Sequence, residues 1–137
     1  MKMRVHFPGN KKVYADYNGF TIETDQPPQG GGEGSAPAPF DLFLASMGTC
    51  AGIYVLGFCE QRGIDTEGME IIQTVDYNPY KRLIEQVNLE VRLPENFPEK
   101  YKAAVLNAAK LCAVKKHLET PPEFNVFATE TTGVFAD

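Results

Sequence analysis

The segment from Leu42 to Cys59 is the feature that most constrains the fold, because it contains no charged residue. If the segment is a helix, its apolar residues lie on all sides, so that helix must be covered almost completely. The length of the segment would also allow a membrane span. Ser46, Thr49, three glycines and the lack of flanking basic or aromatic belts favour a buried helix of a soluble protein instead. We therefore expect no membrane segment.

Flanking residues predict where this helix begins and ends. Pro39 fits the first helical turn, and Asp41 places a negative charge at the positive end of the helix dipole. Gly63 suits the left-handed position that follows many helices. These signals predict a helix from about residue 39 to residue 62. A single chain of 137 residues can hardly cover such a helix, so we expect a homodimer in which the second copy covers the exposed face.

Alternating apolar and polar residues predict three antiparallel strands before this helix. The alternation runs through residues 1–25, with Pro8-Gly9-Asn10 and Asn18-Gly19 as turns between the strands. Residues 26–39 are rich in glycine and proline, which predicts a loop that leads into the helix.

The second half of the chain predicts a hairpin, a second helix and a last strand, without an internal repeat. Residues 69–77 and 83–93 alternate again and predict a β-hairpin. A helical pattern begins after Pro98, continues through Cys112 and ends with the basic residues around His117, and residues 123–130 predict one last strand. The order βββ-α-ββ-α-β predicts an α+β fold in one domain that spans residues 1–137.

Charge and the N-terminal sequence limit the classes of partner. The net charge is −5 and the isoelectric point is about 5.0, so nothing favours binding to nucleic acid. The first twelve residues contain no apolar run of the kind that a secretory signal has, and we expect a cytoplasmic protein.

The three cysteines allow several interpretations. In a reducing compartment Cys50, Cys59 and Cys112 could be packing residues, metal ligands or redox groups. No two of them have the short spacing of a zinc site, and only His6 and His117 could complete one, so we expect no metal.

The geometry of the predicted helices separates the three thiols. Cys59 is nine positions after Cys50, so the two point to opposite sides of one helix, whereas Cys112 can meet Cys50 if the two helices cross there. A reactive Cys50 would also need a cationic or hydrogen-bonding group to lower its pKa. The cations that could supply this are Arg4, Lys11, Lys12, Arg82 and Arg92.

Two sequence motifs resemble those of a known family. The segment PFDLFLASMGTC followed by RGI, and later LCAVKKHL, resemble the two cysteine motifs of the OsmC/Ohr family of organic hydroperoxide reductases, and the chain looks closer to the less characterised OsmC-like branch of that family. The resemblance extends over nearly the whole chain. It implies two central helices packed on antiparallel sheets in an intertwined homodimer, with active sites at the subunit interface.

The resemblance also implies a role for each cysteine of the pair. Cys50 matches the peroxidatic cysteine and Cys112 the resolving cysteine, with an external dithiol as reductant and no organic cofactor or metal. Well-characterised members have a glutamate where this chain has Phe40, and the nearest acid is Asp41. Their arginine comes from the N-terminal strands, where this chain has Arg4. Asp41 and Arg4 are therefore the candidate pocket or activating residues.

Two functions remain open from the sequence. The first is the thiol-dependent reduction of organic hydroperoxides by Cys50 and Cys112, in defence against oxidative stress. The alternative is a non-catalytic OsmC-like dimer that binds a small lipophilic molecule or senses oxidation, with the cysteines as packing or signalling groups.

Overall fold

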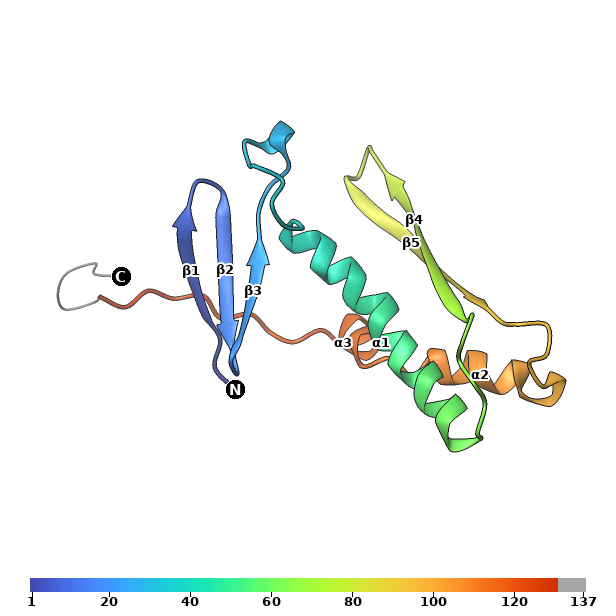
Figure 1. The fold of residues 1–137 in the computed structure, drawn as a ribbon. Coiled ribbons are helices and arrows are strands. Elements are labelled where there is room, and N and C mark those ends of the chain that lie inside the picture. Colours follow the sequence, from blue (N-terminus) through green and yellow to red (C-terminus); the bar gives the residue numbers. More distant parts are fainter. Residues whose placement is uncertain (131–137) are drawn as a thin grey trace.

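The computed structural model describes residues 1–130 and has a mixed α+β fold. In chain order its elements are β1 (Arg4–Gly9), β2 (Lys12–Tyr17), β3 (Phe20–Thr24), the 3-10 turn η1 (Pro28–Gly30), α1 (Pro39–Gln61), β4 (Glu70–Asn78), β5 (Leu83–Arg92), the 3-10 turn η2 (Glu99–Tyr101), α2 (Lys102–Ala109) and α3 (Ala113–Glu119). Figure 1 shows α1 between two separate sheets, with β1, β2 and β3 on one side and β4 and β5 on the other. The predicted α+β class is confirmed.

The first sheet has the antiparallel order β1-β2-β3 that the alternating pattern predicts. Asn18 and Gly19 have φ angles of 49° and 83°. These are the two positive values that a two-residue turn between twisted antiparallel strands requires. The turn places Tyr17 opposite Phe20 and thereby sets the register of β2 against β3.

The loop between β3 and α1 is organised by a buried carboxylate. Asp25 is 1% exposed and accepts hydrogen bonds from the Ser35 hydroxyl at 2.6 Å and from the backbone N–H groups of Gln26 (2.7 Å), Ser35 (3.1 Å) and Glu33 (3.3 Å). A buried carboxylate is tolerated where several donors replace its water shell. These bonds fold the loop back on itself just before α1 begins.

Helix α1 has the predicted boundaries and a largely uncovered surface. Asp41 accepts a hydrogen bond from the Ala38 backbone N–H at 3.0 Å, and Gly63 has a φ angle of 64° just after the helix. Its apolar side chains Phe40 and Ile53 are 55% and 59% exposed. By length and composition α1 could cross a membrane, and 17% of its most apolar window is buried within the chain. The uncharged segment from Leu42 to Cys59 of this helix is therefore only partly covered by the rest of the chain.

The hairpin of β4 and β5 packs on one face of α1. Gln73 on β4 donates a hydrogen bond from Nε2 to the Leu44 carbonyl oxygen at 2.9 Å. Gly48 makes room for this bond, because a Cβ atom there would lie 2.7 Å from Gln73 Oε1. The glycine therefore permits a close approach of the strand to the helix.

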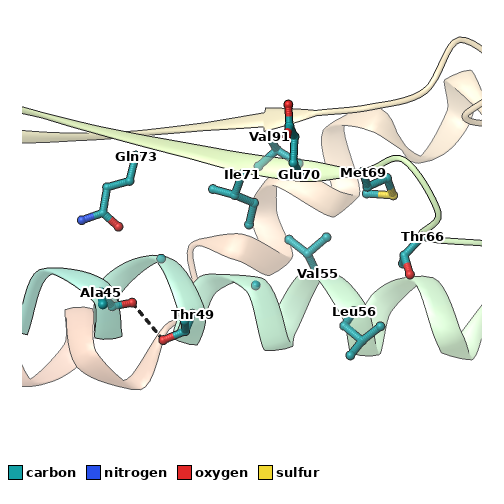
Figure 2. A pocket seen from close by; sticks show the side chains of 12 residues that line it. Ala45, Thr49, Val55, Leu56, Thr66, Met69, Glu70, Ile71, Gln73 and Val91 are labelled. Atoms are coloured by element: carbon teal, nitrogen blue, oxygen red, sulfur yellow. Dashed lines mark hydrogen bonds between the residues drawn. The ribbon is translucent and has the colours of Figure 1, made fainter. Parts of the chain in front are cut away.

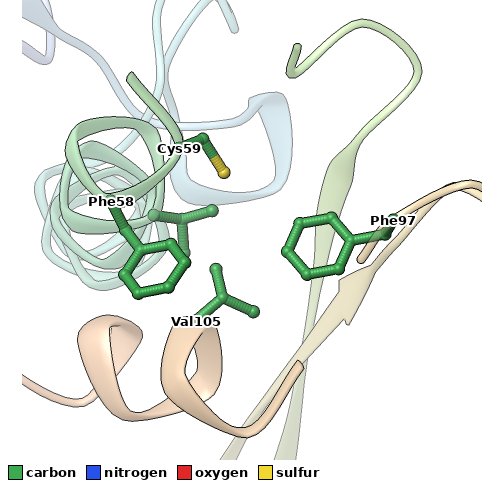
Figure 3. Packing of buried hydrophobic residues seen from close by; sticks show 5 residues of the cluster. Phe58, Cys59, Phe97 and Val105 are labelled. Carbon is green, nitrogen blue, oxygen red and sulfur yellow. The ribbon is translucent and has the colours of Figure 1, made fainter. Parts of the chain in front are cut away.

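The buried core lies at the C-terminal end of α1. Its members are Val55, Phe58, Cys59, Phe97 and Val105. Figure 3 shows Cys59 and Phe58 on α1, Val105 on α2 and Phe97 on the segment that precedes α2, all directed at one another. This cluster fixes α2 against α1 and so determines where the chain that follows α2 is placed.

The prediction of one continuous second helix through Cys112 is wrong. Helix α2 ends at Ala109, and Cys112 has φ −54° and ψ 127°, which is outside the helical region. The backbone N–H of Leu111 bonds the Ala108 carbonyl at 3.0 Å in a tight final turn. No glycine or proline marks this break. Packing of α3 against α1 overrides the high helix propensity of Lys110 and Leu111.

The prediction of a strand at residues 123–130 is also wrong for the single chain. This segment extends along the molecule and has no hydrogen-bonded partner strand among residues 1–130. Phe124, Val126 and Phe127 are 85%, 94% and 82% exposed. An alternating pattern predicts a strand only where a neighbouring strand is available to pair with it.

Candidate functional site

Cys50 and Cys112 lie together where α1 meets the start of α3. Cys50 is on α1, and Cys112 occupies the position that precedes the first residue of α3. The two thiol groups are close enough for each to shift the pKa of the other, and both cysteines are free thiols. The break after α2 produces this contact, since it redirects the chain at Cys112 and turns α3 onto α1.

Hydrogen bonds from the backbone lower the pKa of Cys50. The N–H group of Val114 has the largest effect on this pKa, the Cys112 thiol the next, and the N–H group of Ala113 adds to it, while partial burial opposes them. Donors that point at a sulfur stabilise the thiolate more than the neutral thiol. Within the described chain no Lys or Arg contributes to this shift.

The pKa of Cys112 is shifted in the opposite direction. Burial raises this pKa most, and the hydrogen bond to Cys50 raises it further, because Cys112 is the donor in that bond. The pair therefore combines one thiol with a lowered pKa and one with a raised pKa, an arrangement that is common at functional sites. Cys50 is the more acidic thiol of the pair, and Cys112 is the less acidic one.

Cys59 belongs to the core and takes no part in this pair. Its side chain is 0% exposed, and burial raises its pKa, with a small opposing effect of Arg62. A cysteine in such surroundings behaves as a small apolar residue.

The candidate residues Arg4 and Asp41 are not brought to Cys50 within one chain. Arg4 lies on β1, and its Nη1 atom is 3.3 Å from Asp16 Oδ2. Asp41 caps the first turn of α1. Their assignment to the site stays a prediction.

Two of the other candidate cations, Lys12 and Arg92, form ion pairs with acids elsewhere. Lys12 Nζ pairs with Glu33 at 3.0 Å, and Arg92 Nη1 pairs with Glu70 at 3.1 Å. The sequence analysis missed the two backbone N–H groups at Ala113 and Val114. No side-chain pattern reports such donors, and only the motif around Cys112 could have indicated that the helix restarts there.

Two apolar grooves flank the thiol pair. The first, which we call the Cys112 groove, has a volume of about 420 Å³; it is lined by Met47, Leu89, Leu106, Lys110, Cys112 and Leu118, among others. The second, the α1–α3 groove, has a volume of about 520 Å³; it is lined by Phe43, Ser46, Ala113, Val114, His117 and Phe124, among others. Both could hold an apolar molecule, the first against Cys112 and the second against Ala113 and Val114.

A third groove lies away from the thiols, between α1 and β4. It has a volume of about 460 Å³, and Figure 2 shows Val55, Ile71 and Met69 lining it. The Thr49 hydroxyl donates to the Ala45 carbonyl at 2.9 Å, so it leaves the groove largely apolar. Within residues 1–130, no group of three or more His, Cys, Asp or Glu side chains could hold a metal ion.

Solved structures share this fold. A protein assigned to the osmotic stress and detoxification response of Psychrobacter arcticus 273-4 matches with a TM-score of 0.72 and 23% sequence identity, over 85% of this chain and 86% of that chain. An organic hydroperoxide resistance protein OsmC from Legionella pneumophila matches with a TM-score of 0.52 and 17% identity, over 85% of this chain and 87% of that chain.

The family itself follows from the sequence comparison. None of the curated proteins compared with the chain is a match. The family model described as OsmC-like protein matches residues 32–127, which include α1, the hairpin and all three cysteines. The chain therefore belongs to the OsmC-like protein family.

Proposed function

We propose that the protein reduces organic hydroperoxides through Cys50 and Cys112. The observation that carries this proposal is the set of donors around the Cys50 sulfur, namely the N–H groups of Val114 and Ala113 and the Cys112 thiol. These groups stabilise a thiolate, and the thiolate is the form that attacks a peroxide. The second thiol is already within hydrogen-bonding reach of the first.

The reaction would proceed in three balanced steps. The Cys50 thiolate attacks the terminal oxygen of the hydroperoxide, the O–O bond breaks, and the products are a sulfenic acid on Cys50 and, after protonation, an alcohol. The Cys112 thiol then attacks the sulfenic sulfur, which forms the disulfide and releases water. An external dithiol reduces this disulfide by exchange and is itself oxidised.

The grooves support an organic substrate over hydrogen peroxide. The Cys112 groove and the α1–α3 groove have mostly apolar walls, and they are lined by Cys112 and by its neighbours Ala113 and Val114, respectively. Burial of an alkyl or aryl group there would contribute roughly 25 cal/mol for each Å² removed from water. Hydrogen peroxide has no such group and would gain nothing.

Non-catalytic binding is the second candidate function. Within the described residues no cation acts on Cys50, and the apolar groove between α1 and β4 lies away from the thiols. Both facts suit a dimer that holds a small lipophilic molecule or senses oxidation. In that case the cysteines would form a slow signalling pair or act only in packing.

A homodimer in the cytoplasm is part of the proposal. The exposed apolar residues of α1, such as Phe40 and Ile53, and the uncovered segment around Phe124 and Val126 would be covered by a second copy. A reducing compartment would keep both thiols reduced between turnovers.

Oxidation with a single equivalent of hydroperoxide tests the proposed enzyme. Reduced protein is mixed with one equivalent of cumene hydroperoxide at neutral pH, and peptides are mapped by mass after the free thiols are blocked. We expect rapid formation of a Cys50–Cys112 crosslink. Cys112→Ala should stop at a sulfenic acid on Cys50, and Cys59→Ala, the matched control in the core, should react as the wild type does.

The same experiment separates the two candidate functions. If wild-type thiols persist for many minutes with cumene hydroperoxide, the enzyme proposal is wrong and the binding function is favoured. A crosslink that includes Cys59 would instead show that Cys112 is not the resolving residue.

A further inference from the structure

His117 on α3 has one ring nitrogen fixed and the other open. Its Nδ1 atom lies 2.7 Å from the Ala113 carbonyl oxygen. A carbonyl oxygen can only accept, so Nδ1 carries the hydrogen of this bond. Nε2 has no hydrogen-bond partner among residues 1–130 and, in the neutral ring, holds a lone pair that can take up a proton.

The α1–α3 groove is lined by this ring and by residues close in sequence to both thiols. On α1 it is lined by Ser46, which lies one helical turn before Cys50 and shares its face. On α3 it is lined by Ala113, whose N–H group helps to lower the Cys50 pKa, and by His117 one turn further on. Along the axis of α3, His117 is therefore about one turn, ~5.4 Å, beyond the residue that donates to Cys50.

The proposed reaction needs a proton in that part of the groove. When the thiolate takes the terminal oxygen, the remaining oxygen would leave as an alkoxide, which is a strong base and a poor leaving group. A hydroperoxide bound with its terminal oxygen at Cys50 and its organic part in the α1–α3 groove has the second oxygen on the side of His117. A general acid at that position would remove the cost of releasing an alkoxide.

We propose that His117 donates the proton that converts the leaving alkoxide into an alcohol. The inference rests on the proposed hydroperoxide reduction. Cys50 releases its proton to solvent on ionising, Nε2 takes one up from solvent, and Nε2 gives it to the leaving oxygen as the O–O bond breaks. Sulfur loses two electrons, the peroxide gains them, and no proton is gained or lost overall. The bond to the Ala113 carbonyl keeps the ring turned for this transfer.

The test compares two oxidants that differ in their need for this proton. Cumene hydroperoxide releases an alkoxide, whereas peracetic acid releases acetate, a weak base that leaves without protonation. His117→Gln keeps a polar side chain of similar size and removes the proton donor. We expect the second-order rate of Cys50 oxidation by cumene hydroperoxide to fall roughly 100-fold or more, within the range that general acid catalysis contributes. The rate with peracetic acid should change less than about threefold, as should alkylation by iodoacetamide, since neither needs the donor.

A matched control is available on the same helix. Lys116 is exposed, is adjacent to His117 and does not line the groove, so Lys116→Gln should leave all three rates unchanged. The iodoacetamide rate also reports whether each variant keeps the folded environment of Cys50.

Each outcome decides a separate point. Equal slowing with both oxidants would overturn the inference, because it would indicate a structural role for His117. Fast oxidation by cumene hydroperoxide in both the wild type and His117→Gln would overturn the inference and leave the proposed function standing. A wild type that peracetic acid oxidises quickly and cumene hydroperoxide does not would overturn the proposed function together with the inference.

Discussion

Replacing Gly48 with alanine tests how the β4–β5 hairpin is held against α1, two residues before Cys50. Alanine in a helix interior is favoured over glycine by about 1 kcal/mol. At this position, however, the new Cβ atom would lie 2.7 Å from Gln73 Oε1. The end of the Gln73 side chain must then move, and its 2.9 Å hydrogen bond to the Leu44 carbonyl is lost. Such a bond contributes about 1 kcal/mol.

In Gly48→Ala the gain in helix propensity and the loss of the Gln73 hydrogen bond should cancel. Changing Gln73 as well allows each effect to be measured separately. We expect Gly48→Ala alone to leave the unfolding free energy within about 0.5 kcal/mol of the wild type. Gln73→Ala alone should lower it by about 1 kcal/mol. In the Gln73→Ala background, Gly48→Ala should raise it by about 1 kcal/mol, because nothing is left to displace. The coupling between the two sites is therefore about 1 kcal/mol.

Urea unfolding of the four proteins measures this coupling. The protein concentration must be the same in all four, since a dimer would make stability depend on it. The slope of the unfolding free energy against urea concentration should not change. If Gly48→Ala stabilises the wild type and the Gln73→Ala variant equally, the contact between Gly48 and Gln73 does not exist and the argument fails.

Two further predictions concern ionisable groups. The hydrogen bonds from Ser35, with those of Gln26 and Glu33, lower the pKa of Asp25 to about 2, below its value in the unfolded chain. The contribution of the Asp25 carboxylate to the free energy of unfolding should therefore be fully present above about pH 4 and be lost as the pH falls towards 2. Thermal unfolding between pH 2 and pH 6 should show this loss in the wild type, and a reduced loss in Asp25→Asn, which should also be less stable at neutral pH. Cys112→Ala removes one of the donors that lower the pKa of Cys50, so the pH at which iodoacetamide alkylation reaches half its maximum rate should rise; an unchanged midpoint would contradict the thiol–thiol hydrogen bond.

Features determined by local chemistry could be predicted from the sequence. The Asn18-Gly19 turn and the limits of α1 follow from backbone conformations that few residues adopt, so their residue types are informative. The meeting of Cys50 and Cys112 was predictable only as a possibility, since it requires two helices to cross at one point.

Features determined by tertiary contacts could not be predicted. The break at Cys112 has no glycine or proline to signal it, and the donors at Ala113 and Val114 are backbone groups that every residue except proline has. The expected strand at 123–130 failed for a related reason. Its alternating residues indicate a face that could be buried, and they carry no information on which strand would bury it.

The acidity of Cys50 has an unusual genetic consequence, because its main donors are peptide N–H groups. Alanine scanning would not detect them, since exchanging one side chain for another at position 113 or 114 leaves the amide in place. Drift at these two positions would likewise leave the thiol activated. Only a change to proline would remove a donor and keep the helix, because proline has no N–H group and is tolerated in the first turn of a helix.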